Sequence, residues 1–249
     1  KIESTEYSMI DQYNAGYLRI KTFGSDTTPD VKKALEFFKA KKVSRLIIDL
    51  RFNPGGLLNS AVDISDFFLD KDTVIVSTKG RGDNAREQIF KAANPMYYSG
   101  EIIILVNKGS ASASEILSGA LKDKKRALLV GEKTFGKESM QKTYSLDREL
   151  GIALTIAKYY TPSGAMIHGK GIMPDREVKY ADVAEADTEE LKIISRDKLL
   201  NKFVTIKTEY SESVKQEFHK FLQSNNIKIS DRTADLILKR EISKYHKNI

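Results

Sequence analysis

The chain has 249 residues, of which 41% are hydrophobic and 30% are charged, which is the composition of a folded globular protein. It contains no cysteine, and this excludes thiol nucleophiles, cysteine-bound zinc and disulfides. The net charge of +7 comes from basic and acidic residues interspersed along the chain, so a solvated basic surface explains it without nucleic-acid binding. No run of about 18 uncharged apolar residues is present, so no integral membrane span is predicted. Because the chain begins at Lys1 rather than at a methionine, we expect a mature form or an excised fragment.

The first 180 residues alternate between strand and helix patterns, which predicts an α/β fold. Alternating or continuous apolar residues predict strands over residues 17–23, 43–50, 73–78, 101–106, 127–130 and 151–160. Apolar residues at helical spacing predict helices over residues 30–42, 57–69 and 113–122, the first of them capped by Thr28 or Asp30. The order of strand, helix and strand at the start of the chain indicates a βαβ unit.

From Ala181 the composition shifts to long, polar helical segments, over residues 188–202, 211–225 and 230–247. The sequence therefore predicts two domains, residues 1–180 as the core and residues 181–249 as a helical C-terminal extension. We expect the extension to pack on the core or on a partner, including a second copy of the chain.

The most distinctive stretch is Gly109-Ser-Ala-Ser-Ala-Ser-Glu-Ile116, where an apolar strand ends and a helix begins. A serine at such a junction lies beside unpaired helix N–H groups, which stabilise a developing alkoxide or oxyanion. Ser112 is therefore a candidate nucleophile. The alternative is that Ser112 only caps the helix, with Glu115 completing a capping box, and this segment alone does not decide between the two.

A nucleophilic serine needs a base, and the three histidines are not obvious partners for one. There is also no G-x-S-x-G motif, which argues against a serine–histidine–aspartate hydrolase. The remaining common solution is an unprotonated lysine, which requires burial or low local polarity. Lys137 is the candidate because it follows an apolar strand, in a glycine turn beside Phe135.

An oxyanion hole needs backbone N–H groups that are free of secondary structure, and Asn53-Pro54-Gly55-Gly56 can supply them after its strand. Taken alone, such a turn is a weak signal, because most Pro-Gly-Gly sequences are simple turns.

Several motifs together, from about Tyr17 to Val178, resemble the carboxyl-terminal processing peptidases, also called tail-specific proteases. They are Leu50 to Gly56, Ser110 to Ile116, Asp123 with Arg126 and Ala127, Gly131 to Lys137, Gln141, and Tyr159 to Gly164. The resemblance implies a crotonase-like ββα superhelix core and a serine endopeptidase that cleaves protein substrates near their C-termini. It also implies that no metal or cofactor takes part.

The resemblance assigns a role to each matched position. Ser112 is the nucleophile, Lys137 its base, and Gln141 the residue that orients the lysine. The oxyanion donors are the backbone of Gly55 and Gly56 and that of Ala113, next to the nucleophile. Glu115 and Asp123 lie on the Ser112 face of the helix, and we expect both to be supporting groups, with Glu115 capping the helix and Asp123 holding a neighbouring loop.

Two features depart from the family pattern. Glu138 follows Lys137 where a glycine is usual, and a carboxylate close to the ammonium would weaken the base. The PDZ domain that captures the substrate's terminal carboxylate in many members is not in this chain. The resemblance favours the periplasm or cell envelope of a bacterium.

Two other functions stay open at this point. One is a non-catalytic peptide- or ligand-binding module on the same fold, against which the joint presence of Ser112, Lys137 and Gln141 argues. The other is an acyl-CoA enzyme of the same topology, for which the sequence offers no nucleotide site.

Overall fold

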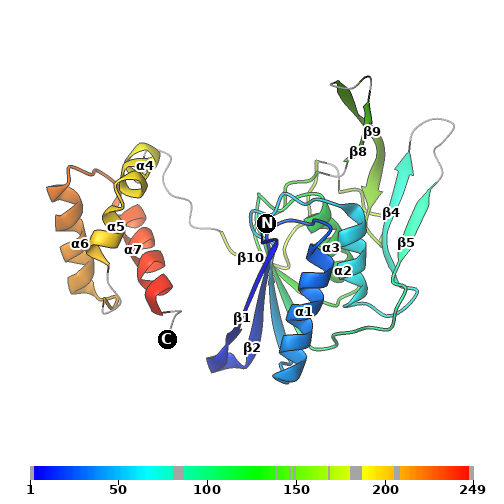
Figure 1. Cartoon of the computed structure of the whole chain (residues 1–249), viewed down its shortest axis with the longest axis horizontal. Helices are drawn as coiled ribbons and strands as arrows, with labels where there is room; N and C mark the ends of the chain where they lie inside the picture. The colour runs from blue at the N-terminus through cyan, green and yellow to red at the C-terminus, as the bar shows by residue number, and fades with distance from the viewer. Residues whose placement is uncertain are drawn as a thin grey trace. The chain divides into compact units, whose positions relative to one another are not determined.

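The computed structural model describes residues 3–80, 87–137, 139–145, 147, 150–167, 169–179, 187–204 and 208–246. It divides the chain into two compact units, residues 1–180 and residues 181–249. The first unit is built from strands and helices, and the described residues of the second form helices and no strand (Figure 1).

A six-stranded sheet forms the centre of the first unit, in the order β1-β2-β3-β6-β7-β10. Its strands are β1 (Thr5–Ile10), β2 (Ala15–Ile20), β3 (Arg45–Asp49), β6 (Glu101–Val106), β7 (Leu128–Gly131) and β10 (Arg176–Glu177). A short 3-10 helix, η1 (Asp11–Tyr13), joins β1 to its antiparallel neighbour β2, and all other neighbouring pairs are parallel. Parallel neighbours require crossover connections. The loops after β3, β6 and β7 therefore all lie on the side of the sheet where the strands have their carboxyl ends.

Three helices, α1 (Thr27–Ala40), α2 (Leu58–Asp66) and α3 (Ala113–Asp123), lie in the crossovers from β2 to β3, from β3 to β6 and from β6 to β7, on one side of the sheet (Figure 1). The apolar residues of their inner faces and of the strands beneath them form one continuous core. Leu35 and Phe38 of α1 and Ile48 of β3 are completely buried in it. Burial of these apolar side chains therefore fixes the helices on the sheet, and with them the loops that join the strand ends to the helices.

A second, antiparallel sheet has the order β5-β4-β9-β8. Its strands are β4 (Val74–Gly80), β5 (Gln88–Lys91), β8 (Ser139–Ser145) and β9 (Gly151–Tyr160). Residues 157–160 of β9 pair with β4, whereas residues 151–155 pair, among the described residues, only with β8. The β8–β9 hairpin therefore projects from the body of the unit (Figure 1).

The α/β class predicted from the sequence is confirmed, and the predicted strands and helices of the first unit are present with small shifts at their ends. One cap was wrong. The first helix begins at Thr27 after Asp26, and the Thr27 hydroxyl accepts the N–H of Gly24 at 2.9 Å, so neither Thr28 nor Asp30 starts it. Strands β1, β5, β8 and β10 were not predicted.

The second unit contains α4 (Thr188–Arg196), α5 (Leu199–Phe203), α6 (Glu212–Ser224) and α7 (Asp231–His246). Its core includes Phe218 and Leu238, both completely buried. The helix predicted over residues 188–202 is interrupted, because Lys198 adopts a left-handed backbone with φ of 50°. No helix among the described residues is long and apolar enough to cross a membrane.

Candidate active site

Three loops converge where β3, β6 and β7 end. β3 leads into the turn at residues 50–56, β6 into the loop at residues 107–112, and β7 into the segment at residues 132–137. Because these strands are parallel neighbours, their carboxyl ends lie side by side. Open α/β sheets bind ligands at the carboxyl ends of their strands. Here these ends bring the predicted serine, glycine turn and lysine segment together.

Ser112 is the residue that caps the amino terminus of α3, and its backbone has φ of 54° and ψ of −114°. A positive φ is unusual for a serine and marks backbone strain of the kind concentrated at functional sites. Ser112 and Glu115 have the capping-box arrangement predicted from the sequence, in which the Glu115 carboxylate accepts the Ser112 N–H at 2.9 Å. Capping therefore coexists with the features expected of a nucleophile and does not exclude them.

The three serines of this motif differ in accessibility. Ser110 and Ser114 are completely buried, whereas Ser112 is half-buried. The hydroxyl that a substrate can reach is therefore that of Ser112.

The glycine turn lies directly against the Ser112 loop. A Cβ placed on Gly55 would come within 2.8 Å of the Ser112 Cβ and of the Ala113 nitrogen, and Gly55 has φ of 101°. The Gly55 N–H donates to Asn53 Oδ1 at 2.9 Å, so it is not available to a substrate oxygen. The N–H groups of Gly56 and Ala113 have no acceptor within the described part of the chain. The candidate oxyanion donors are thus narrowed to these two.

Glu115 is completely buried and accepts four hydrogen bonds. Its Oε1 accepts the Thr134 hydroxyl at 2.5 Å and the Gly136 N–H at 2.7 Å, while its Oε2 accepts the N–H groups of Ser112 and Lys137, each at 2.9 Å. Burial raises the pKa of the Glu115 carboxyl, and these four bonds lower it, with the balance above its ordinary value. One carboxylate therefore fixes both the serine loop and the lysine segment.

Lys137 is held in the site by its backbone, whose N–H donates to Glu115. Its side chain is exposed, as is that of Phe135, so the low-polarity surroundings expected from the sequence are not provided by the residues that the structure describes. Within the same residues no hydrogen bond joins the Lys137 ammonium to the Ser112 hydroxyl. Gln141 lies in β8 at an irregularity in its pairing with β9. Glu138 lies outside the described residues.

Asp123 ends α3, eleven residues after Ser112. Its carboxylate accepts the Ser163 N–H at 2.9 Å and so holds the turn after β9. No contact between Asp123 and Ser112 is present, so Asp123 acts on a loop at the other end of its helix.

Sequence reasoning missed Thr134 as part of the site. Its hydroxyl donates to Glu115 and accepts the Ile172 N–H at 2.7 Å, and its own N–H donates to the Ile172 carbonyl at 3.1 Å. Thr134 thereby links the lysine segment to the loop at residues 169–172. The signal was its place in the Thr-Phe-Gly-Lys motif, but only the fold reveals the partner of its hydroxyl.

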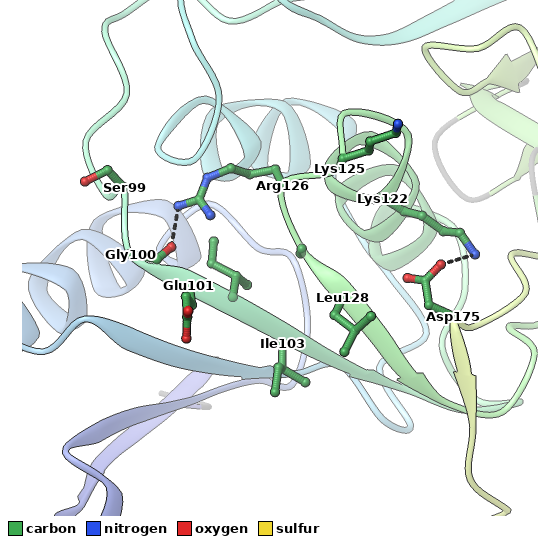
Figure 2. A pocket seen from close by; sticks show the side chains of 11 residues that line it. Ser99, Gly100, Glu101, Ile103, Lys122, Lys125, Arg126, Leu128 and Asp175 are labelled. Carbon is green, nitrogen blue, oxygen red and sulfur yellow. Dashed lines mark hydrogen bonds and ion pairs between the residues drawn. The ribbon is translucent and has the colours of Figure 1, made fainter.

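A pocket of about 670 Å³ lies at the other ends of the strands, where β6 and β7 begin (Figure 2). Ile103 and Leu128 line it, Arg126 donates there to the Gly100 carbonyl, and Lys122 pairs with Asp175 at 3.0 Å. It is separated from Ser112 by the length of the strands and belongs to another part of the surface. Among the described residues no group of three or more histidine, aspartate or glutamate side chains could hold a metal ion.

The model of peptidase family S41 matches residues 14–178, and the chain therefore belongs to this family. Among the relatives, a carboxyl-terminal-processing protease of Synechocystis is 40% identical over 174 residues, covering 70% of this chain and 40% of that protein. The carboxy-terminal processing protease CtpA of Bacillus subtilis is 34% identical over 181 residues, covering 73% of this chain and 38% of that protein.

A solved structure of a photosystem II D1 C-terminal processing protease superimposes with a TM-score of 0.64 and 32% identity, covering 76% of this chain and 51% of the other. The chain thus spans about 40% of the length of these curated relatives and about half of this structure.

Proposed function

We propose that the chain is the catalytic core of a serine endopeptidase of the carboxyl-terminal processing type, with Ser112 as nucleophile and Lys137 as base. The observation that carries the proposal is the setting of Ser112. It is the accessible serine of its motif, at a helix amino terminus, next to the Gly56 and Ala113 N–H groups, for which the described residues provide no acceptor. Membership of peptidase family S41 supports the same assignment.

The reaction is acyl transfer in two halves. The neutral amine of Lys137 takes the Ser112 proton as the hydroxyl oxygen attacks the substrate's peptide carbonyl, and a tetrahedral oxyanion forms. The same proton then goes to the leaving amine as the C–N bond breaks. Water attacks the resulting ester, Lys137 accepts its proton and returns it to Ser112, and the new carboxylic acid leaves.

The oxyanion would be bound by the N–H groups of Gly56 and Ala113. Both are backbone donors in a rigid setting, and donors of this kind stabilise a developing charge without rearranging during the reaction. Gly55 has a steric role instead, because its lack of a side chain lets the turn lie close to the Ser112 loop.

Lys137 must lose its proton to act, and its side chain is exposed in this structure. A bound substrate would cover the site and lower its polarity, which favours the neutral amine. The shared hydrogen bonds of Ser112 and Lys137 to Glu115 support the pairing, because they hold the two backbones close together. In this scheme Gln141 orients the lysine, and Glu115 and Asp123 are supporting groups.

The substrates would be proteins or peptides cut near their C-termini, as the names of the relatives indicate for those proteins. We propose a periplasmic or envelope location on the same resemblance, and the bacterial origin of these relatives supports it. The core at residues 1–180 would carry the chemistry. The helical extension at residues 181–249 would serve packing or self-association.

The test is hydrolysis of a fluorogenic peptide with an apolar C-terminus by the wild type and by Ser112→Ala, with Ser118→Ala as the matched control. We expect Ser112→Ala to reduce hydrolysis to background and to abolish labelling by a serine-acylating probe, while Ser118→Ala keeps both. Hydrolysis that persists in Ser112→Ala would remove the assignment. A wild-type protein that binds the peptide without turnover would favour a binding module.

A further inference from the structure

The proposed reaction uses one serine of the Ser110-Ala-Ser-Ala-Ser114 motif and leaves the other two unexplained. Both side chains are completely buried in polar contacts. The Ser110 hydroxyl donates to the Leu50 carbonyl at 2.8 Å, and the Ser114 hydroxyl donates to the Asn53 carbonyl at 3.0 Å. Each outer serine therefore reaches out of its own loop to the turn after β3.

The two acceptors bracket the start of that turn. The Asn53 N–H donates to the Leu50 carbonyl at 3.1 Å, and the Asn53 side chain accepts the Gly55 N–H and donates to the Ile20 carbonyl at 2.7 Å. The Leu50 and Asn53 carbonyls therefore help to position the turn, together with Phe23, whose N–H donates to the Gly55 carbonyl and whose carbonyl accepts the Leu57 N–H on either side of Gly56.

The spacing between the two loops has little tolerance. The Ala111 N–H also donates to the Asn53 carbonyl, at 3.0 Å, and a Cβ on Gly55 would meet the Ala111 carbonyl oxygen at 2.7 Å. A shift that moves the two loops apart would therefore lengthen these hydrogen bonds, and residue 55 can carry no side chain at this contact. The same shift would change the separation of the Gly56 and Ala113 N–H groups.

We propose that Ser110 and Ser114 are positioning residues. Their hydrogen bonds hold the segment around Ser112 against the glycine turn and thereby set the distance between the Gly56 and Ala113 N–H groups of the oxyanion hole. This inference rests on the proposed function, because it assumes an oxyanion between Gly56 and Ala113. It explains why serines occupy both sides of Ser112, at a spacing that places the outer two hydroxyls on the Leu50 and Asn53 carbonyls.

Ser118 provides a matched comparison on the same helix. It is also completely buried, and its hydroxyl donates to the Ser114 carbonyl at 2.7 Å, a bond within α3. Ser118→Ala removes a buried hydroxyl of the same kind without touching the turn. Any difference between Ser114→Ala and Ser118→Ala therefore measures the contact between the loops.

The experiment uses the full chain with Ser110→Ala, Ser114→Ala and Ser118→Ala. Peptide hydrolysis is normalised to the folded fraction by titration with an acylating probe. Inhibition by a peptide boronate, whose tetrahedral adduct places an oxygen in the oxyanion hole, is compared with inhibition by the cleaved product peptide. We expect kcat/KM and boronate affinity to fall together, about tenfold in each of the first two variants, with KM and product affinity unchanged.

Ser118→Ala should match the wild type in activity whatever its change in melting temperature. Ser110→Cys and Ser114→Cys, which keep a weak donor of similar size, should recover part of the loss. Equal effects in Ser114→Ala and Ser118→Ala, or a loss of kcat/KM without a loss of boronate affinity, would overturn the inference and leave the nucleophile assignment intact. Failure of the proposed function would show instead as activity in Ser112→Ala.

Discussion

The backbone N–H groups of Ser112 and Lys137 donate to the same oxygen, Oε2 of Glu115, each at 2.9 Å. The two residues are 25 positions apart in the sequence and come from loops after different strands. A carboxylate suits this place because it is an acceptor at both oxygens and can serve four donors at once. These donors offset part of the cost of burying the carboxylate, although burial still leaves the pKa of Glu115 above its ordinary value.

Replacing Glu115 by glutamine tests that arrangement. The amide has one accepting oxygen and one NH2 group, so two of the four donors would face another donor. We expect kcat/KM to fall about 100-fold, because both loops shift together. Peptide hydrolysis measures it, and Glu115→Asp, which keeps the charge on a shorter side chain, should lose less. Activity of Glu115→Gln within twofold of the wild type would contradict the role.

The pH dependence of stability gives an independent check on Glu115. Because burial raises its folded-state pKa, the folded protein binds this proton more tightly than the unfolded chain, whose glutamate has a pKa of about 4.3. Its contribution to the free energy of unfolding therefore increases as the pH falls through the folded-state pKa towards that value. Urea denaturation at several pH values should show this increase in the wild type relative to Glu115→Gln. A difference that stays constant across the range would contradict it.

The base is tested by the pH–rate profile. If Lys137 is the base, kcat/KM rises with pH as the amine loses its proton, and Lys137→Met removes this limb together with at least about 1000-fold of the activity. Glu138→Gly isolates the neighbouring carboxylate. A rising limb that moves to lower pH in Glu138→Gly would mean that Glu138 holds the lysine in its charged form, and an unchanged limb would mean that the two side chains diverge.

The convergence of the loops that carry the candidate residues was predictable from the sequence because it depends on local signals. An apolar run followed by glycine or serine marks the carboxyl end of a buried strand, and parallel strands bring such ends together. The Ser112 and Glu115 pair follows from helix capping, which needs a spacing of three residues.

The features that the sequence did not predict are of two kinds. Some have no hydrophobic pattern, and others depend on contacts between residues far apart in the chain. Strand β1 is an edge strand whose residues are half-buried or exposed, so it has no alternation to detect. The exposure of the Lys137 side chain and the engagement of the Gly55 N–H by Asn53 depend on how loops pack, which spacing does not encode. The hydrogen bonds of Ser110 and Ser114 to the Leu50 and Asn53 carbonyls likewise depend on how the two loops pack.

An ion pair at the end of β3 anchors the start of the glycine turn. Asp49, almost completely buried, accepts from Arg51 Nε at 2.9 Å, from Arg51 Nη2 at 2.6 Å and from the Tyr17 hydroxyl at 2.7 Å. Burial raises the pKa of Asp49, but the bonds from Arg51 and Tyr17 outweigh it and leave the pKa below its ordinary value. Asp49→Asn should therefore lower the free energy of unfolding at pH 7 by about 2 kcal/mol.

That loss should depend on pH in a defined direction. A lowered folded-state pKa gives stability that is present above the unfolded value of about 3.9 and is lost as the pH falls through the folded value. Chemical denaturation of the wild type and Asp49→Asn should thus converge in acid. Asp30→Asn is the control, since its pair with Lys33 is on the surface at 3.6 Å and should change stability by less than about 0.5 kcal/mol. An Asp49→Asn deficit that persists unchanged in acid would rule out the ion pair as its source.

The loop at residues 169–172 supports the lysine segment through close backbone contact, and substitutions at its two glycines test this separately. Gly171 has φ of 60°, and a Cβ there would lie 2.3 Å from the Thr134 carbonyl oxygen. Gly169 has a similar φ of 62°, but a Cβ there would meet no described atom within 4 Å. Gly169→Ala should cost about 1 kcal/mol for its left-handed backbone, with activity near that of the wild type.

Gly171→Ala carries the same backbone cost and must in addition push the Thr134 backbone away. Because Thr134 holds Glu115, and Glu115 holds the backbones of Ser112 and Lys137, the displacement should reach the reacting groups. We expect Gly171→Ala to lose at least about tenfold in kcat/KM beyond Gly169→Ala, measured on protein shown to be folded by its melting curve. If the two alanine variants hydrolyse peptide equally well, the lysine segment tolerates movement of Thr134, and the loop serves stability alone.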